Sequence, residues 1–195
     1  MTALPVPDFE PDNRAAWRAW LLEHHTTPGG VRCVLHKKSA GPVNLSAAEA
    51  VEEALCFGWI DSVGRKLDER RSTLYFAPRK KGSGWSAVNK ARIEQLEAAG
   101  LLHASGLARI KAVKADGSWV LLDAVETLEV PPDLQIALET AGALEQWTAF
   151  PRSARRGILE WIVQAKTVLT RAGRVEETAR LAAQGERANQ WRKKS

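Results

Sequence analysis

Only two cysteines occur in the 195 residues, Cys33 and Cys56, and neither lies in a Cys-x-x-Cys or His-rich pattern. This spacing excludes a disulfide framework and a cysteine-based zinc site. No apolar run approaches the roughly 18 residues that are needed to span a bilayer. The opening segment MTALPVPDFEPDNR has no basic stretch followed by an apolar one, which a secretory signal requires. We therefore expect a cytoplasmic protein with buried, reduced thiols and no membrane span.

The sequence patterns of common catalytic sites are also missing. The four histidines have no HExxH-type spacing, and neither a GxSxG elbow nor a P-loop of the GxxxxGK[ST] type is present. Cys56 is expected at the C-terminal end of a helix, where the helix dipole raises the pKa of a thiol and makes it a poor nucleophile. The sequence therefore predicts no catalytic residue, no metal site and no cofactor.

Positive charge is distributed unevenly along the chain. The formal net charge is +5, and the part from Pro151 onward holds eleven Lys or Arg residues against four Glu, which leaves the preceding part slightly acidic. A basic C-terminal part is typical either of a solvated helical face or of a surface that binds nucleic acid or another anionic partner. Both interpretations are open, and the solvated face is favoured because charge runs usually serve only solubility.

Periodicity predicts helices and strands in a definite order. A helix is expected after Asn13, a strand around residues 31–35, and a second helix after Ser46, which forms a capping box with Glu49. The segment 59–78 alternates apolar and polar residues, as antiparallel strands do, and Pro78 is expected to end the last strand. Four helical segments follow, with stops at Gly100, Gly117, Phe150 and Gly185.

The predicted fold class is therefore α+β, with a small antiparallel sheet packed by helices and followed by an all-helical C-terminal region. A hydrophobic content of 45% is sufficient to build a real core in a chain of this length. We expect two regions, residues 1–125 and residues 126–195, packed together as one unit.

Several segments resemble those of a known bacterial family. They are ALCFGWIDS, KLDE, FAPRKKGSGWSAVNKARIEQLEAAG, VPPDLQIAL and SARRGILEWIVQAKTVLTRAGRV. Together they resemble the YdeI/OmpD-associated family, also described as the bacteriocin-protection family, over nearly the whole chain from about Trp17 to about Gly185. The resemblance implies a cytoplasmic role in tolerance of bacteriocins or antimicrobial peptides, and therefore in a stress response. It implies no particular catalytic residue.

The residues themselves point to one candidate binding site around PRKKGSGWS. If a helix begins with Ser83 as its N-cap, free backbone N–H groups and the positive end of the helix dipole lie next to Arg79 and Lys81. Such a helix start can bind a phosphate or a carboxylate. An ordinary capped helix is the alternative interpretation. We expect the ligand-binding residues to be Trp59, Asp61, Arg79, Lys81, Ser83, Trp85, Ser86, Asn89 and Arg92.

Arg92 falls on the predicted inward face of this helix, close to Trp85 in the helical projection. A buried guanidinium needs a partner, and Asp61 on the preceding sheet is a reasonable one. The pair is either a structural link between helix and sheet or one wall of a cleft in which Trp59 and Trp85 stack on a flat ligand.

Three hypotheses about function follow. The favoured one is a non-enzymatic binding or interaction protein that recognises a small anionic ligand or a protein partner through the Trp59/Trp85 cleft. The second is a nucleic-acid-binding protein that uses the basic C-terminal helices. The third is a small-molecule enzyme with Asp61 as base and Arg79 and Arg92 as an electrophilic clamp. The sequence does not predict an oligomeric state.

Overall fold

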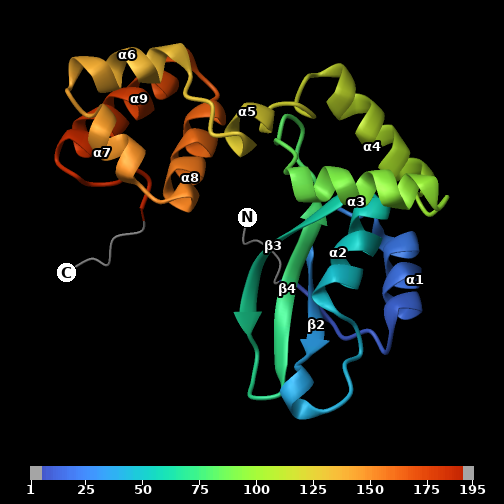
Figure 1. The fold of residues 1–195 in the computed structure, drawn as a ribbon. Helices are drawn as coiled ribbons and strands as arrows, with labels where there is room; N and C mark the ends of the chain where they lie inside the picture. Colours follow the sequence, from blue (N-terminus) through green and yellow to red (C-terminus); the bar gives the residue numbers. More distant parts are fainter. Residues whose placement is uncertain (1–5, 191–195) are drawn as a thin grey trace, which may run out of the picture. The chain divides into compact units, whose positions relative to one another are not determined.

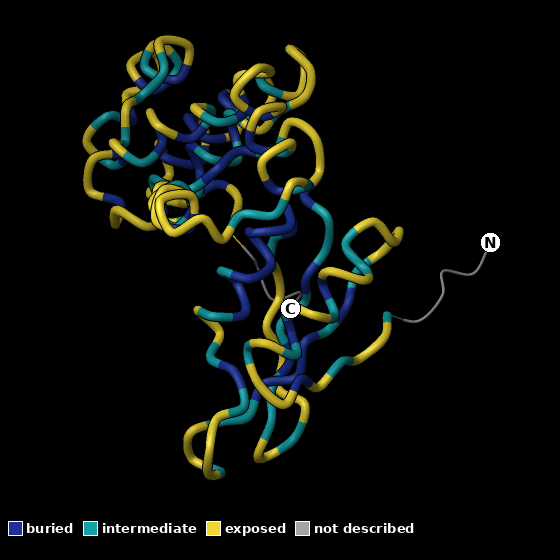
Figure 2. The backbone as a smooth tube through the Cα atoms, turned by 90° about the vertical axis from the view of Figure 1, so that its right-hand side faces the viewer, coloured by how far each residue is buried: buried dark blue, intermediate teal, exposed yellow. Residues whose placement is uncertain are grey.

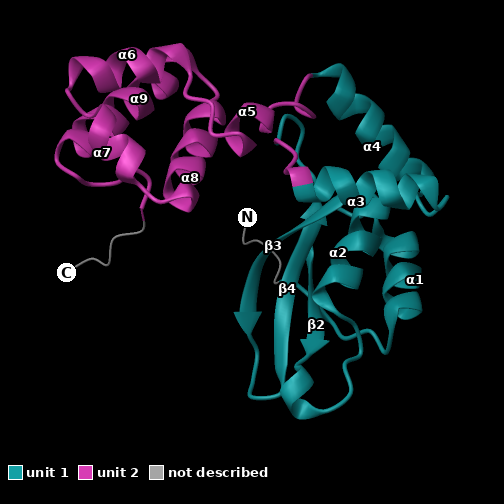
Figure 3. Ribbon diagram, viewed as in Figure 1, with its two compact units in different colours: residues 1–83, 88–116 teal, residues 84–87, 117–195 magenta. Residues whose placement is uncertain are grey.

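The computed structural model describes residues 6–190 and divides them into two compact units (Figure 1). Unit 1 contains residues 1–83 and 88–116, and unit 2 contains residues 84–87 and 117–195 (Figure 3). The chain therefore enters unit 2 for four residues, returns to unit 1, and leaves it after Asp116. This division falls earlier than the boundary at residue 125 that we expect from the sequence.

A four-stranded sheet forms the centre of unit 1. Its strands are β1 (Asp8–Phe9), β2 (Val31–His36), β3 (Trp59–Lys66) and β4 (Arg71–Pro78), in the spatial order β1-β2-β4-β3. The pairs β2/β4 and β3/β4 are antiparallel, whereas β1 lies parallel to β2. The α+β class is thus confirmed. The sheet is mixed rather than purely antiparallel, because β1, a short strand that the sequence does not predict, pairs in parallel with β2.

A β-bulge interrupts the pairing of β3 with β4. Trp59 lies opposite Pro78 and Asp61 opposite Phe76, but the register shifts between Asp61 and Gly64. An extra residue in one strand moves the following side chains to the other face. Val63 lies in this irregular stretch and is 56% exposed, whereas Trp59 at the start of the strand is 2% exposed.

Two helices of unit 1 cover one face of the sheet (Figure 1). They are α1 (Arg14–His24) and α2 (Ala47–Cys56), and a 3-10 turn, η1 (Lys38–Ala40), precedes α2. Asn13 caps α1, and the capping box of Ser46 and Glu49 is confirmed. Trp17 of α1 is fully buried beside Phe76, and its indole N–H donates to the carbonyl of Ala50 in α2 at 3.0 Å. One tryptophan thus joins both helices to the sheet.

Glu53 is a charged residue inside this core, with 4% of its surface exposed. Its two carboxylate oxygens accept hydrogen bonds from Arg14 Nε and Arg18 Nη1, each at 2.6 Å. A buried charge is tolerated when it is paired and hydrogen-bonded in this way. The pairing fixes α1 against α2 through charges, in addition to their apolar contact.

The sheet is followed first by two helices, α3 (Ala87–Ala98) and α4 (Ala104–Ala115), before the helices of unit 2. Gly106 allows α4 to approach the end of α2 closely, because a Cβ at this position would lie 2.2 Å from the carbonyl oxygen of Cys56. Only glycine fits so near a neighbouring backbone.

Unit 2 is helical in its described part. Its helices are α5 (Asp123–Glu126), α6 (Pro132–Thr140), α7 (Leu144–Ala149), α8 (Arg152–Val163) and α9 (Val168–Ala183). Their inward residues, among them Leu134, Leu138, Ile158 and Ile162, form one hydrophobic core, and buried positions alternate with exposed ones along the chain (Figure 2). Two of the predicted helical segments are each divided into two helices. One break contains Gly142 with a φ of 61°, and the other contains Thr167, which caps α9.

Within residues 6–190, none of the helices combines the length and the apolar character that crossing a bilayer requires.

Candidate functional site

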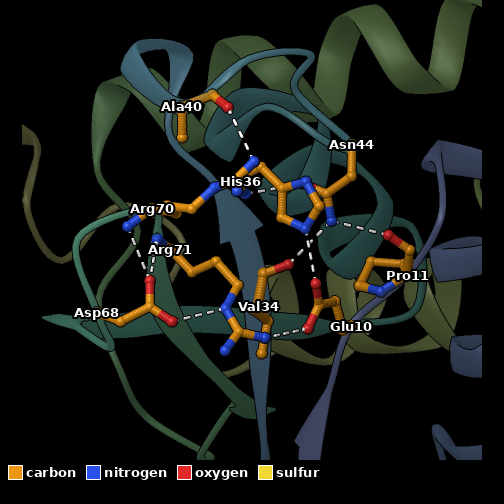
Figure 4. A network of polar contacts seen from close by, with 9 residues as sticks. All are labelled: Glu10, Pro11, Val34, His36, Ala40, Asn44, Asp68, Arg70 and Arg71. Atoms are coloured by element: carbon orange, nitrogen blue, oxygen red, sulfur yellow. Dashed lines mark hydrogen bonds and ion pairs between the residues drawn. The ribbon is translucent and has the colours of Figure 1, made fainter.

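A polar network joins the end of β2 to the start of β4 (Figure 4). His36 is the last residue of β2 and lies opposite Arg71, the first residue of β4. Glu10 follows β1 and reaches both residues. Its Oε1 accepts a hydrogen bond from His36 Nε2 at 2.6 Å, and its Oε2 accepts one from Arg71 Nη1 at 2.8 Å. Residues from three neighbouring strands thus meet at one carboxylate.

Asp68 holds the other side of the Arg71 guanidinium. Its Oδ2 accepts from Arg71 Nε at 2.8 Å, while its Oδ1 accepts from the backbone N–H groups of Arg70 and Arg71 at 2.8 and 2.7 Å. Aspartate commonly fixes a turn through such bonds to the backbone just after it. Lys37 adds a bond from its Nζ to the carbonyl of Asp68 at 2.7 Å. The turn and the Arg71 side chain are therefore held in one arrangement.

Asn44 fixes the loop on the opposite side of the network. Its Oδ1 accepts from the backbone N–H of His36 at 2.8 Å, and its Nδ2 donates to the carbonyls of Pro11 and Val34 at 2.8 and 3.1 Å. The amide side chain thereby satisfies backbone groups at the edge of the sheet that have no strand partner there.

Electrostatics keep both carboxylates ionised. The hydrogen bond from His36 and the neighbouring Arg71 guanidinium lower the pKa of Glu10 below its ordinary value. The pKa of Asp68 is lowered by the hydrogen bond from Arg71 and by the backbone N–H of Arg70. In each case the partner stabilises the charged form of the acid. Arg71 therefore faces two ionised carboxylates, which more than offset its single positive charge.

A cavity of about 550 Å³ opens beside this network. A second hollow of about 260 Å³ shares Glu10, His36 and Pro42 with it. The larger volume lies within the range of small-molecule sites. The residues that line it are Glu10, His36, Ala40, Pro42, Asp68, Arg70 and Arg71.

Arg70 differs from Arg71 in its partners. Its side chain donates one hydrogen bond, from Nη2 to the carbonyl of Ala40 at 3.2 Å, and it forms no ion pair with any carboxylate among residues 6–190. A guanidinium presents five N–H donors in a planar fork that matches a carboxylate or a phosphate. The cavity thus contains one arginine, Arg70, whose other N–H groups are available to a ligand, beside the imidazole of His36.

Some of the site residues predicted from the sequence lie in unit 1. Trp59 is 2% exposed, and its indole N–H donates to the carbonyl of His25 at 3.0 Å. Arg79 is 6% exposed. Burial lowers the pKa of Arg79 to about 10, although the negative charge of Asp61 raises it. The structure therefore associates Asp61 electrostatically with Arg79.

Asp61 and Arg92 both lie in the described part of the chain, and they do not form the predicted ion pair. Instead, Nη1 of Arg92 donates to Oδ1 of Asn89 at 3.1 Å, one turn earlier on α3. Side chains three residues apart on a helix are neighbours, so a local partner is available without reaching the sheet.

The predicted helix start at Ser83 is also corrected. Helix α3 begins at Ala87, and the hydroxyl of Ser83 donates to the carbonyl of Lys80 at 2.7 Å within a turn. Ser83 therefore does not cap the helix, and Lys81 is exposed in the same turn.

The remaining predicted site residues, Trp85 and Ser86, belong to unit 2, where Trp85 is buried with its ring 5.2 Å from that of Trp119. A common cleft for Trp59 and Trp85 stays a prediction.

The sequence offered little to identify the network of Glu10, His36, Asp68 and Arg71. These residues come from three segments far apart in the chain, and they match no motif. The only local signal is the charged turn between the two predicted strands, which is interpretable from sequence as a solvated hairpin.

Arginines of the basic C-terminal part are engaged within unit 2. Arg156 pairs with Glu126 and with Glu160, each at 2.8 Å, and Arg171 pairs with Asp133 at 2.7 Å. Guanidinium groups that are held by carboxylates offer less charge to phosphates. This favours the interpretation of a solvated, ion-paired helical surface.

The thiols are unsuited to nucleophilic chemistry. Burial raises the pKa of Cys33 to about 12, and burial is also the main cause that raises the pKa of Cys56. Thiols that remain protonated react slowly. Within residues 6–190, no three His, Cys, Asp or Glu side chains are grouped as metal ligands.

These features define a two-unit α+β protein with a polar cavity at one end of its sheet. The chain belongs to the family of a domain of unknown function (DUF8412), whose model matches residues 9–109, more than half of the chain. Residues 127–185 match the family model described as bacteriocin-protection, YdeI or OmpD-associated. The resemblance to that family is confirmed for the C-terminal region, whereas the N-terminal region matches the separate model. No curated protein and no solved structure matches the chain.

Proposed function

We propose that this protein is a non-enzymatic binding protein for a small anionic ligand, which is held in the cavity at the ends of β2 and β4. The observation that carries the proposal is Arg70, a cavity-lining guanidinium without a carboxylate partner in the described chain. A carboxylate or phosphate group in the cavity would accept hydrogen bonds from its planar fork.

The surroundings of Arg70 support this ligand class. Glu10 and Asp68 direct their carboxylate oxygens to His36 and Arg71, so the N–H donors of Arg70 are left for a ligand, while the formal charges of the two carboxylates and the two arginines cancel. The network also holds the cavity walls in place before a ligand arrives, which reduces the entropic cost of binding.

The lining residues favour binding over catalysis. None of them is Ser, Thr, Cys or Lys, so the cavity offers no hydroxyl, thiol or amine nucleophile. The two carboxylates are occupied by arginine and histidine and have lowered pKa values, which makes them weak bases. We include in the proposal the role in bacteriocin protection that the family description names, together with a cytoplasmic location, and anion binding as the molecular activity.

Arg79 supports a second location for the same function. It is buried and lies near the charges of Asp61 and Arg109, so two cations accompany one carboxylate in unit 1. In this version the sequence-predicted residues around Arg79 hold the anion.

A thermal-shift titration with inorganic phosphate and with acetate, at constant ionic strength in chloride, tests the proposal. A ligand that binds the native state raises the melting temperature in a saturable manner. We expect Arg70→Gln to abolish this shift, and Lys111→Gln, which removes an exposed cation of α4, to retain it.

Arg79→Gln distinguishes the two locations. If it abolishes the shift while Arg70→Gln does not, the ligand binds at the sequence-predicted site. If neither probe produces a saturable shift in the unmodified protein, anion binding is rejected.

A further inference from the structure

Helices α6 and α9 of unit 2 leave an apolar groove of about 700 Å³ along their line of contact. The side chains that line it are mostly small and come from both helices. They include Ala137, Ala141, Ala172, Ala179 and Ala183. Alanine side chains leave room for larger apolar groups from outside. These alanines give the groove an apolar floor, charged side chains of both helices also line it, and it lies wholly within unit 2.

Large apolar side chains stand at its borders. Val168 and Leu169 begin α9 and are 84% and 86% exposed, and Ile136 of α6 is 63% exposed. Val168 itself lines the groove. Leu169 is placed by helical periodicity on the outer edge of α9, beside Glu176 and Arg180. Exposed apolar side chains of this size gain free energy when a partner removes them from water.

The charges around the groove are balanced. Asp133 and Arg171 form an ion pair across its two helices, and Glu176 and Arg180 lie on the α9 side. Two acids and two bases give no preference for a partner of one charge sign. A second copy of the same surface, however, can place its acids against these bases and its bases against these acids.

We propose that this groove is a homodimer interface, in which Val168 and Leu169 of each chain enter the groove of the other. A two-fold interface requires one surface that carries both the protrusion and the hollow that receives it. The exposed start of α9 provides the protrusion, and the alanine-lined floor provides the hollow. The dimer does not depend on the proposed anion binding.

Sedimentation velocity over a wide range of protein concentrations tests this interface. The unmodified protein should be a dimer that dissociates on dilution. Leu169→Asp places a charge on the protrusion, and Ala172→Trp fills the hollow without adding a charge. Each should raise the dimer dissociation constant by about 100-fold or more, as changes at the centre of an interface do.

Val120→Asp is the matched control, because Val120 is 58% exposed in unit 2 but does not line the groove. It should leave the dimer intact, and circular dichroism should show all three variants folded. The proposal is overturned if the unmodified protein is monomeric at every concentration, whether or not the groove binds another molecule. Folded Leu169→Asp and Ala172→Trp variants that dimerise normally would also overturn it.

Discussion

At the scale of single residues, Glu10 connects the ionic state of one side chain to the stability of unit 1. It accepts hydrogen bonds from His36 and Arg71, and these partners lower its pKa. The unfolded chain lacks the partners, so its Glu10 carboxyl binds protons at a higher pH than the folded carboxyl does. Stability rises with pH wherever the unfolded state binds more protons.

We therefore expect the contribution of Glu10 to be complete above the ordinary carboxyl pKa of about 4.3 and to disappear as the pH falls through the lowered folded value. Because the side chain is 41% exposed, solvent screening limits this contribution to less than about 1 kcal/mol. Glu10→Gln should lose this amount at neutral pH. Its free energy of unfolding, measured with urea, should also fall less steeply than that of the unmodified protein as the pH is lowered. Asp12→Asn, the control, should follow the unmodified protein. If the free energies of unfolding of Glu10→Gln and the unmodified protein fall in parallel at acid pH, the pKa of Glu10 does not contribute to stability.

At the scale of secondary-structure elements, α2 shows how a helix start is fixed locally. Ser46 accepts from the backbone N–H of Glu49 at 3.2 Å, and the Glu49 carboxylate accepts from the backbone N–H of Ser46 at 2.9 Å. The pKa of Glu49 is lowered because the hydroxyl of Ser46, at 2.7 Å, and its backbone N–H both donate to the carboxylate. The reciprocal bonds satisfy two N–H groups that a helix start otherwise leaves unpaired.

Ser46→Ala should accordingly destabilise the protein by about 1 kcal/mol. Ser39→Ala is a suitable control because Ser39 is exposed within η1. Chemical denaturation of both variants measures the difference. Equal stabilities would mean that the cap contributes nothing.

Elements with strong local signals were predictable from sequence, and elements or contacts set by tertiary pairing were not. The cap at Ser46 and the strand end at Pro78 follow from the chemistry of single residues. β1 contains two residues, which is too short for any periodic pattern, and it exists only because β2 offers it an edge. The site depends on the same pairing, since the register of β2 against β4 places His36 opposite Arg71. No spacing in the sequence records that register.

At the scale of the whole molecule, Trp85 lies in a four-residue segment, 84–87, that belongs to unit 2, although the chain before residue 84 and from residue 88 to residue 116 belongs to unit 1. Its ring lies 5.2 Å from Trp119, and a Cβ at the adjacent Gly84 would lie 2.6 Å from the Leu122 side chain. Leu122 is itself part of the hydrophobic core of unit 2. A segment from the middle of the chain therefore contributes to the packing of the C-terminal unit.

Trp85→Ala should remove about 3–5 kcal/mol of stability, as the truncation of a fully buried tryptophan does. In hydrogen exchange, the amides of α8 and α9 should lose protection. Val88→Ala, which changes a 60% exposed residue of α3, should leave the exchange unchanged. A loss of protection confined to β2 and β4 would show that Trp85 supports unit 1 alone.

The excursion of residues 84–87 restricts how such a protein can be reshuffled by recombination. A gene segment that begins at residue 117 encodes most of unit 2 but omits Trp85, and it would present Trp119 without its neighbouring ring to any new host protein. A gene segment that ends at residue 116 encodes Trp85 but lacks Trp119. Transfer of the C-terminal unit with its packing intact therefore requires residues 84–87 as well as the chain from residue 117 onward.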